Sequence, residues 1–205
     1  MSKSISEKFK GIPTTAISDA LNGMNNLDSS IKPVSSYLKL VGKAVTVKVR
    51  AADNKLVLKG IAEAEQGDVL VVDAKGYMNN AVAGDFVIGL ASTLGLAGIV
   101  IDGVVRDIGA IKEMDFPVFC KGVTTAASDK RGSGEVNAPI SCGDAVIHPG
   151  DIIIGDEDGV VCVPQEIAIE IFEKAQEKLK KDQQREEGVL NNPDAARAFI
   201  KKQLS

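Results

Sequence analysis

The chain has 205 residues, of which 44% are hydrophobic and 25% are charged, as is typical of one ordinary globular domain that buries an apolar core. Its one histidine and three cysteines exclude a histidine-rich zinc site within a single chain, a cysteine zinc cluster and a disulfide framework. Because the formal net charge is -4 and aromatic residues make up only 4% of the chain, we expect no nucleic-acid partner.

The start of the chain, MSKSISEKFK, is polar and contains no apolar h-region of a secretory signal. Together with the few, scattered cysteines, this predicts a cytoplasmic protein. The longest uncharged run, residues 86–101, is shorter than the roughly 20 residues that cross a bilayer. We therefore expect no membrane partner and interpret the run as a buried helix that leads into a buried strand.

The first half of the chain alternates between helix and strand patterns. Helices are predicted at 13–21, 54–65, 80–94 and 107–114, and strands at 42–50, 68–73, 98–102 and 117–121. The strand at 42–50 alternates polar and apolar residues, which predicts one solvated face, whereas the apolar strand at 68–73 should be covered on both faces. This alternation favours a layer of parallel β-α-β units.

The second half changes character after Gly122. Short strands are predicted at 140–142, 145–147, 151–154 and 160–163, separated by Gly-Asp and Pro-Gly pairs that favour tight turns. We interpret them as a meander packed against the first half. A long charged helix at 165–187 and a short helix at 193–204 follow. We predict one domain over 1–188 and a C-terminal helical tail over 189–205 at a subunit interface.

Two dipeptides are the strongest candidates for a site: Gly84-Asp85 and, after 20 intervening residues, Arg106-Asp107. The second pair follows a predicted buried strand at the start of a helix, where open α/β sheets bind ligands. Asp107 could simply cap that helix, or its carboxylate could bind a hard cation while Arg106 binds a substrate carboxylate. The backbone N–H groups of residues 84–87 also suit an anion.

The two pairs and their spacing resemble the signature of the class II pyruvate aldolases, which cleave 4-hydroxy-4-methyl-2-oxoglutarate and 4-carboxy-4-hydroxy-2-oxoadipate and belong to the superfamily of the regulator of ribonuclease activity A. Segments 15–20, 67–73, 98–107, 116–119, 149–151 and 156–161 are also similar to that family, over about residues 12–180. The resemblance implies an α/β fold class: a layered β/β/α domain of the swivelling type, with a central parallel or mixed sheet, a second antiparallel β layer and flanking helices.

The resemblance also implies roles for individual residues. Asp107 matches the direct ligand of Mg2+ or Mn2+, Arg106 the residue that binds the pyruvyl part of the substrate, and Asp85 an acid that reaches the metal through water. The implied substrate-binding segment is Gly84, Asp85, Phe86 and Val87. In the family an acid from a neighbouring subunit's C-terminal helix completes the site, for which Glu177 is our candidate, so the resemblance implies a homotrimer or a dimer of trimers.

The implied activity is that of a metal-dependent lyase that releases pyruvate through a metal-stabilised enolate, with oxaloacetate decarboxylation alongside and no Schiff-base lysine. A water positioned by Asp85 or by the cation would take the 4-hydroxyl proton. The alternative is a non-catalytic regulator that acts by binding another protein, but those regulators lack the complete Arg-Asp pair. A methyltransferase would call for a glycine-rich cofactor loop, which the sequence does not contain.

Other chemically interesting residues have simpler interpretations. The only histidine, His148, lies between a predicted strand and a turn and is expected to be structural. The three cysteines lie in apolar strand contexts and are expected to be buried. The acidic segment 156–159 lacks the pattern of a calcium loop and predicts a tight turn. The polar loop 124–134 is either a plain surface loop or a lid that contacts the substrate.

Overall fold

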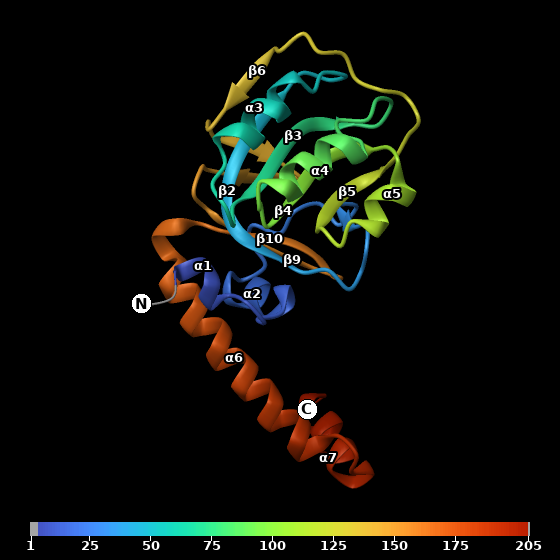
Figure 1. Cartoon of the computed structure of the whole chain (residues 1–205). Coiled ribbons are helices and arrows are strands. Elements are labelled where there is room, and N and C mark those ends of the chain that lie inside the picture. Colours follow the sequence, from blue (N-terminus) through green and yellow to red (C-terminus); the bar gives the residue numbers. More distant parts are fainter. Residues whose placement is uncertain (1–3, 205) are drawn as a thin grey trace.

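The computed structural model describes residues 4–204 (Figure 1). Residues 1–3 and 205, which belong to the predicted domain and tail, lie outside the described residues. The helices are α1 (Ile5–Lys8), α2 (Thr14–Ala20), α3 (Lys55–Glu63), α4 (Asp85–Thr93), α5 (Ile108–Glu113), the 3-10 helix η1 (Gln165–Ile167), α6 (Ala168–Val189) and α7 (Pro193–Gln203). The strands are β1 (Lys32–Pro33), β2 (Leu40–Val49), β3 (Val69–Tyr77), β4 (Gly98–Val105), β5 (Val118–Val123), β6 (Gly134–Val136), β7 (Ile140–Cys142), β8 (Ala145–Ile147), β9 (Ile152–Asp156) and β10 (Gly159–Val163).

The main sheet has the strand order β1-β5-β4-β3-β2-β9-β10, with β6 paired to β2 as well. Strands β2 to β5 are parallel to their neighbours, whereas β1, β6, β9 and β10 pair in the antiparallel sense. Strands β7 and β8 form a separate antiparallel pair. The predicted α/β fold class, with a mixed central sheet, a small second sheet and flanking helices, is therefore confirmed.

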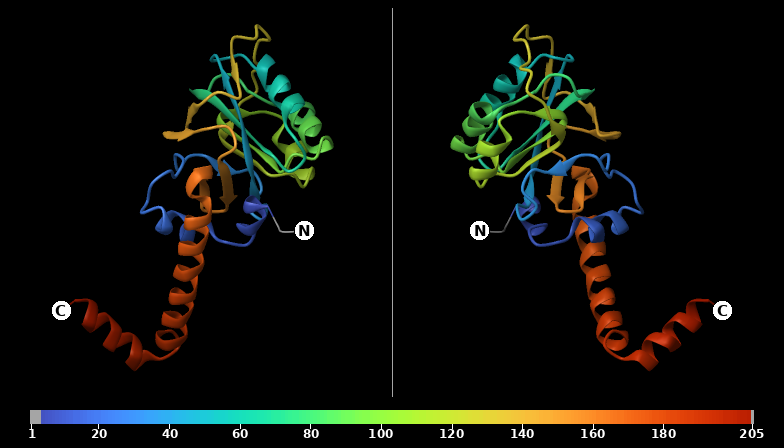
Figure 2. Two further views of the ribbon diagram at one scale, coloured as in Figure 1. Left: turned by 90° about the vertical axis from the view of Figure 1, so that its left-hand side faces the viewer. Right: turned by 90° about the vertical axis from the view of Figure 1, so that its right-hand side faces the viewer.

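Two apolar cores hold the layers together. Helices α3, α4 and α5 pack on one face of the main sheet through a core that includes Val57, Ile88 and Ile111. The β7–β8 hairpin packs on the opposite face through Ile140 and Ile147 (Figure 2). Each parallel strand is therefore covered on both faces, as predicted for residues 68–73.

Two expectations about the strands were wrong. The solvated face predicted for β2 is absent over most of the strand, because α3 covers one face and the second sheet lies against the other. Lys43 is the only residue of β2 that is exposed. The predicted meander is also divided between two sheets. Strands β9 and β10 extend the edge of the main sheet beyond β2, and only β7 and β8 form the second layer.

A third apolar core surrounds the β9–β10 hairpin and is closed by α1, α2 and the beginning of α6. Beyond this core α6 extends away from the body, and α7 folds back at an angle (Figure 2). The buried residues of α6, Ala168, Ile171 and Ala175, all lie in its first part. Between residues 4 and 204 no helix combines the length and apolar character needed to span a bilayer.

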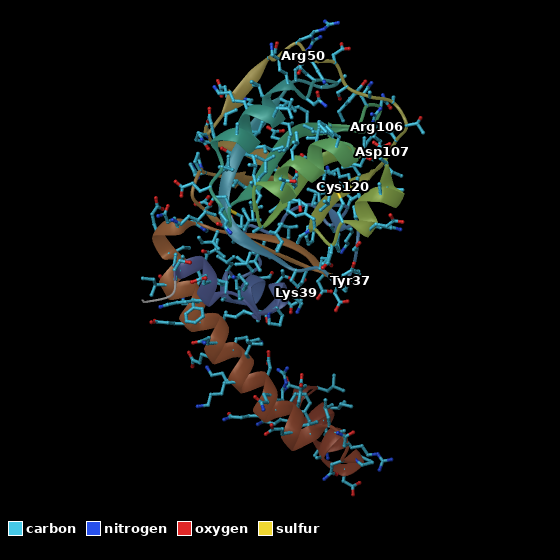
Figure 3. The ribbon with its side chains drawn as sticks, viewed as in Figure 1. Tyr37, Lys39, Arg50, Arg106, Asp107 and Cys120 are labelled. Atoms are coloured by element: carbon cyan, nitrogen blue, oxygen red, sulfur yellow. The ribbon has the colours of Figure 1, made fainter. Side chains whose placement is uncertain are left out.

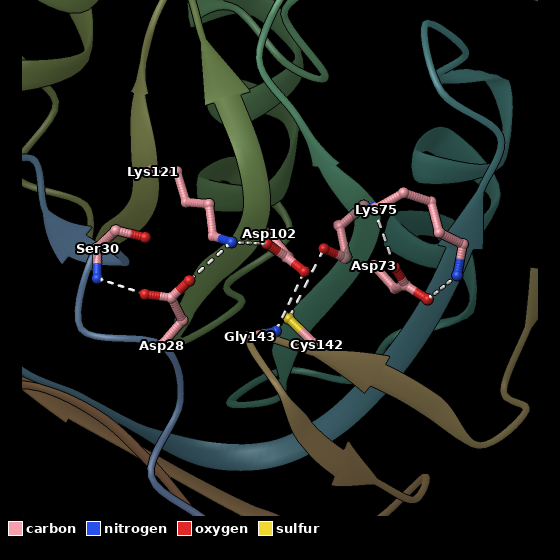
Figure 4. Close-up of polar contacts among 9 residues, drawn as sticks. Asp28, Ser30, Asp73, Lys75, Asp102, Lys121, Cys142 and Gly143 are labelled. Atoms are coloured by element: carbon pink, nitrogen blue, oxygen red, sulfur yellow. Dashed lines mark hydrogen bonds and ion pairs between the residues drawn. The ribbon is translucent and has the colours of Figure 1, made fainter.

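A buried charge network joins the main sheet to the second layer (Figure 4). The Lys121 ammonium lies 2.8 Å from Asp102 Oδ1 and 3.0 Å from Asp28 Oδ2. The other Asp102 oxygen accepts a hydrogen bond from the backbone N–H of Gly143, at the turn between β7 and β8 (3.1 Å). One lysine of β5 therefore neutralises a buried aspartate of β4 that positions the hairpin.

The pKa values of this network follow from its contacts. Burial would lower the pKa of Lys121, but the hydrogen bonds and charges of Asp102 and Asp28 outweigh it and raise this pKa to about 12. The backbone N–H of Ser30 and the Lys121 ammonium together lower the pKa of Asp28 to about 2. The ion pairs therefore persist across the whole neutral range of pH.

Replacing Lys121 by methionine leaves the Asp102 carboxylate buried without its cation, so we expect Lys121→Met to lower the free energy of unfolding by about 3 kcal/mol. Urea denaturation at neutral pH measures this loss. Adding Asp102→Asn should recover part of the stability, because it removes the unpaired charge. The exposed Lys180 provides the control; an equal effect of Lys180→Met would contradict the role of the network.

Candidate active site

Arg106 and Asp107 directly follow β4, at the carboxyl end of a fully buried parallel strand. Asp107 adopts the left-handed conformation (φ 59, ψ 38), and although it begins α5 its side chain makes no capping hydrogen bond. A left-handed aspartate is uncommon and costs conformational energy, which the surrounding structure must supply. The capping interpretation of Asp107 therefore fails, and its carboxylate is left available for another purpose.

The Asp107 carboxylate turns back toward Arg106, with 3.2 Å between Asp107 Oδ2 and Arg106 Nε (Figure 3). The segment before α4 runs beside the end of β4, because the Arg106 N–H donates to the Ala83 carbonyl (3.1 Å) and Ala83 pairs with Val105. This pairing brings the two predicted dipeptides together. Both side chains of the Arg106–Asp107 pair are about two-fifths exposed and reach solvent.

Gly84 lies directly against this pair. A Cβ atom at position 84 would stand 2.4 Å from Asp107 Oδ2 and 3.1 Å from Arg106 Nε. The backbone of Gly84 is extended (φ -119, ψ -173), a conformation open to any residue. Glycine is therefore needed here for space, and not for its conformational freedom.

Helix α4 begins at Asp85. The residue before it is Gly84, which has no side chain that could cap the N–H groups of the first turn. Asp85 Oδ1 accepts from the N–H of Phe86 (2.7 Å), which holds this carboxylate at the start of the helix. The Phe86 ring is 75% exposed. The helix start can thus receive an anion on its first-turn N–H groups other than that of Phe86, and at its positive dipole end.

A cavity of about 270 Å3 opens at this point. Its lining residues are Asn54, Ala81, Gly84, Asp85, Phe86, Val87, Arg106, Ala127, Ser128 and Lys130. It therefore contains every predicted substrate-binding residue, together with Asn54 and three residues of the 124–134 loop that were not singled out from the sequence. Of the two interpretations of this loop, the structure supports the one in which it borders the site. In the sequence, the polar composition of this loop was the only indication that it borders the site.

Asp53 holds this loop in place although it does not line the cavity. Its buried carboxylate accepts hydrogen bonds from the backbone N–H groups of Lys55 (3.0 Å) and Gly132 (2.8 Å). Burial alone would raise the pKa of Asp53, but hydrogen bonds from the backbone N–H groups of Lys55 and residues 131–133 outweigh it and hold the pKa below its ordinary value. The ionised carboxylate is thus the anchor of the loop.

The donors at the site suit a hard cation. No group of three or more His, Cys, Asp or Glu side chains is gathered for a metal ion anywhere in residues 4–204, so a site built wholly from protein ligands, as zinc prefers, is not present there. Magnesium commonly uses one or two carboxylates and completes its shell with water and substrate. The exposed Asp107 carboxylate and the nearby Asp85 offer this oxygen-only set, so the residues fit Mg2+ or Mn2+.

The remaining candidates lie elsewhere. Glu177 is exposed on α6, where it pairs with Lys181 (2.7 Å). This helix lies well away from Arg106 of the same chain (Figures 1 and 3). The three cysteines are buried as predicted, and burial raises their thiol pKa values, so they remain protonated. His148 is exposed and lies 3.7 Å from Asp151 Oδ2 at the turn before β9.

The acidic segment 156–159 forms the tight turn of the β9–β10 hairpin, as predicted. Asp156 there accepts hydrogen bonds from both the N–H and the hydroxyl of Thr14 and from the N–H of Asp158. Its carboxylate oxygens are therefore engaged in holding α2 against the hairpin. The Arg106–Asp107 pair, in contrast, is exposed at the carboxyl edge of the parallel strands.

The fold and this site define an α/β protein with a candidate site for a small anion at the edge of its sheet, between a helix start and an arginine–aspartate pair. The family model described as "RraA-like: Aldolase/RraA" matches residues 14–162, and the chain belongs to this family. The resemblance seen in the sequence is thereby confirmed.

Individual relatives agree with this assignment. The chain is 50% identical over 197 residues to a protein of Halalkalibacterium halodurans named "Putative 4-hydroxy-4-methyl-2-oxoglutarate aldolase", covering 96% of this chain and 94% of that protein. An uncharacterized protein from Pseudomonas syringae pv. tomato has a similar solved structure, with TM-score 0.86, 26% identity, and coverage of 98% and 95%. The RNA-processing inhibitor RraA from Thermus thermophilis aligns with TM-score 0.68 and 31% identity, over 74% of this chain and 92% of that one.

Replacing Gly84 by alanine should displace the Arg106–Asp107 pair, because the new methyl group would overlap Asp107 Oδ2. We expect binding of pyruvate, titrated calorimetrically with Mg2+ present, to weaken roughly 10- to 100-fold, the equivalent of one charge-assisted hydrogen bond. Gly89→Ala on the same helix is the matched control, because its Cβ would only contact Met114 Cε at 3.9 Å. Equal binding by Gly84→Ala and the unaltered protein would contradict this site.

Replacing Asp53 by asparagine puts an N–H group against the backbone donors of the loop. We expect the amides of residues 131–133 to exchange with solvent deuterium roughly tenfold faster than in the unaltered protein. Since the pKa of Asp53 is lowered in the fold, its anchoring is present above the ordinary pKa of 3.8 and is lost as pH falls through the lower folded value. Mass spectrometry of exchange at neutral pH gives the measurement; unchanged protection would refute the anchor.

Proposed function

We propose that this chain is a divalent-metal-dependent lyase that cleaves 4-hydroxy-2-oxo acids, of the 4-hydroxy-4-methyl-2-oxoglutarate type, to pyruvate. The observation that carries the proposal is the uncapped, left-handed Asp107 beside Arg106, held against a glycine that leaves the pair open. The family of the chain and the name of its 50% identical relative support it.

The reaction breaks the bond between C3 and C4 of the substrate. The 4-hydroxyl loses its proton, the electron pair of the broken bond passes to the 2-oxo group as an enolate, and a proton then adds to C3 to give pyruvate. A site for this reaction must therefore hold a carboxylate and stabilise the charge that develops on the adjacent keto oxygen.

The residues divide this work between them. The N–H groups at the start of α4 bind the substrate carboxylate, and Arg106 donates to the keto oxygen as it becomes negative. Asp107, with Asp85 close to the helix start, would hold Mg2+ or Mn2+, which supplies electrophilic stabilisation of the enolate. Asp85 positions the water that takes the 4-hydroxyl proton and later returns a proton to C3. Oxaloacetate gives the same enolate when it loses CO2, so the proposal includes oxaloacetate decarboxylation.

The proposed assembly is a homotrimer or a dimer of trimers in which Glu177 of one subunit completes the site of the next. Two features support a shared site: the Arg106 side chain is open to solvent, and Glu177 lies on α6, a helix that extends away from the body of its own chain (Figure 2). The tail over 189–205 would lie at the same interface. Its α7 carries an apolar side chain, Ile200, that is 56% exposed.

Asp107→Asn removes the carboxylate charge but tolerates the left-handed backbone, because asparagine adopts that conformation readily. We expect pyruvate release from 4-hydroxy-4-methyl-2-oxoglutarate, followed by a coupled dehydrogenase assay, to fall at least about 100-fold. Treatment with EDTA should abolish the activity of the unaltered protein, and Mg2+ should restore it. Arg106→Ala should lower both pyruvate release and oxaloacetate decarboxylation.

Asp115→Asn is the matched control, because Asp115 is also an exposed left-handed aspartate (φ 49), but it neither lines the cavity nor forms an ion pair with Arg106 as Asp107 does. It should leave turnover unchanged. Turnover that persists in the presence of EDTA, or that is unchanged in Asp107→Asn, would contradict the proposed mechanism. Absence of turnover with every 4-hydroxy-2-oxo acid and with oxaloacetate would favour the non-catalytic regulator instead.

A further inference from the structure

Two residues that line the cavity beside Arg106 each carry a buried polar atom with no hydrogen-bond partner among the described residues. The atoms are Asn54 Oδ1 and Ser128 Oγ, and both are screened from solvent. Both residues line the same cavity as Arg106. Because buried polar atoms in folded proteins nearly always have hydrogen-bond partners, an unpaired atom on each of two residues that line one cavity points to partners from outside the chain.

The orientation of the Asn54 amide is fixed by its other end. Asn54 Nδ2 donates a hydrogen bond to the carbonyl of Val82 (3.0 Å). A carbonyl oxygen can only accept, so the amide nitrogen must occupy this position and Oδ1 is the atom left unpaired. The ligand group that satisfies Asn54 must therefore be a hydrogen-bond donor.

This requirement selects one group of the proposed substrate. In an ionised 4-hydroxy-2-oxo diacid, the two carboxylates and the keto oxygen can only accept hydrogen bonds. The 4-hydroxyl is the only donor in the molecule. The unpaired amide oxygen of Asn54, a residue that lines the cavity, therefore matches the hydroxyl whose proton is lost in the reaction.

Ser128 and Lys130 match the end of the substrate beyond that hydroxyl. Ser128 Oγ can donate to a carboxylate oxygen, and Lys130, two residues further along the same loop, contributes a positive charge to the cavity lining. The first carboxylate is already assigned to the start of α4, and the keto oxygen to Arg106. The loop is therefore positioned to bind the second, distal carboxylate.

We propose, on the basis of the proposed function, that Asn54 and Ser128 form a distal subsite that makes the enzyme specific for hydroxylated diacids. In the bound substrate, before the hydroxyl proton passes to the water held by Asp85, Asn54 Oδ1 accepts a hydrogen bond from the 4-hydroxyl, and Ser128 Oγ donates one to the distal carboxylate. Both are specificity-determining residues for cleavage. Neither is needed to form the enolate of pyruvate, which has no 4-hydroxyl and no second carboxylate.

The test compares two reactions of the same protein in the presence of Mg2+. One is cleavage of 4-hydroxy-4-methyl-2-oxoglutarate, and the other is exchange of the methyl protons of pyruvate with deuterium, followed by NMR. We expect Asn54→Ala and Ser128→Ala each to lower kcat/KM for cleavage roughly tenfold or more and to leave the rate of pyruvate exchange within about twofold. Product inhibition by pyruvate should also be unchanged.

Thr125→Ala is the matched control, because Thr125 is an exposed hydroxyl residue of the same loop that does not line the cavity. It should change neither reaction. If the rates of cleavage and of pyruvate exchange fall together in these variants, the two residues have a structural role and the subsite is overturned. If cleavage is unchanged in both Asn54→Ala and Ser128→Ala, the subsite is also overturned. If the unaltered protein catalyses neither reaction, the proposed function itself fails, and this result is distinct from a failure of the subsite alone.

Discussion

The site depends on a close approach that only a residue without a side chain permits. Gly84 lies so near the Arg106–Asp107 pair that a single additional carbon would overlap the carboxylate. This contact exists because β4 and the segment before α4 run side by side, joined through Ala83 and Val105. The parallel sheet thus brings an arginine, two aspartates and a helix start together from two segments that are separate in the chain.

Aspartates in this protein differ in how completely their charge is satisfied. Asp53 and Asp156 accept several backbone or hydroxyl hydrogen bonds, and Asp102 is neutralised by Lys121. Asp107 faces only Arg106, keeps its side chain exposed, and occupies a strained backbone conformation. Carboxylates with complete sets of partners stabilise the fold, whereas one that lacks them at the edge of a sheet is available to a ligand.

Local patterns were sufficient for much of the fold. The alternation of helices and strands, the buried strand before Arg106 and the turn at 156–159 follow from periodicity and turn residues, and the structure confirms them. The strand predicted to end at residue 102 continues to Val105, because Asp102, which looks like the end of a strand, is buried against a lysine of β5. Such pairing between distant residues leaves no signal in a local window.

The same limit applies to the site. Arg106, Asp107 and the 84–87 segment were visible because each pair is contiguous and follows a recognisable pattern, whereas Asn54 and Ser128 reach the cavity from separate loops. Asn54 and Ser128 stand out because each has a buried atom without a hydrogen-bond partner, and such an atom can be identified only when all its neighbours are known. The residues proposed to hold the enolate therefore lie in a contiguous motif, and those proposed to distinguish one hydroxy acid from another lie on loops whose positions depend on anchors such as Asp53. Under this proposal the substrate range can change through the loops without disturbing the residues that would stabilise the enolate.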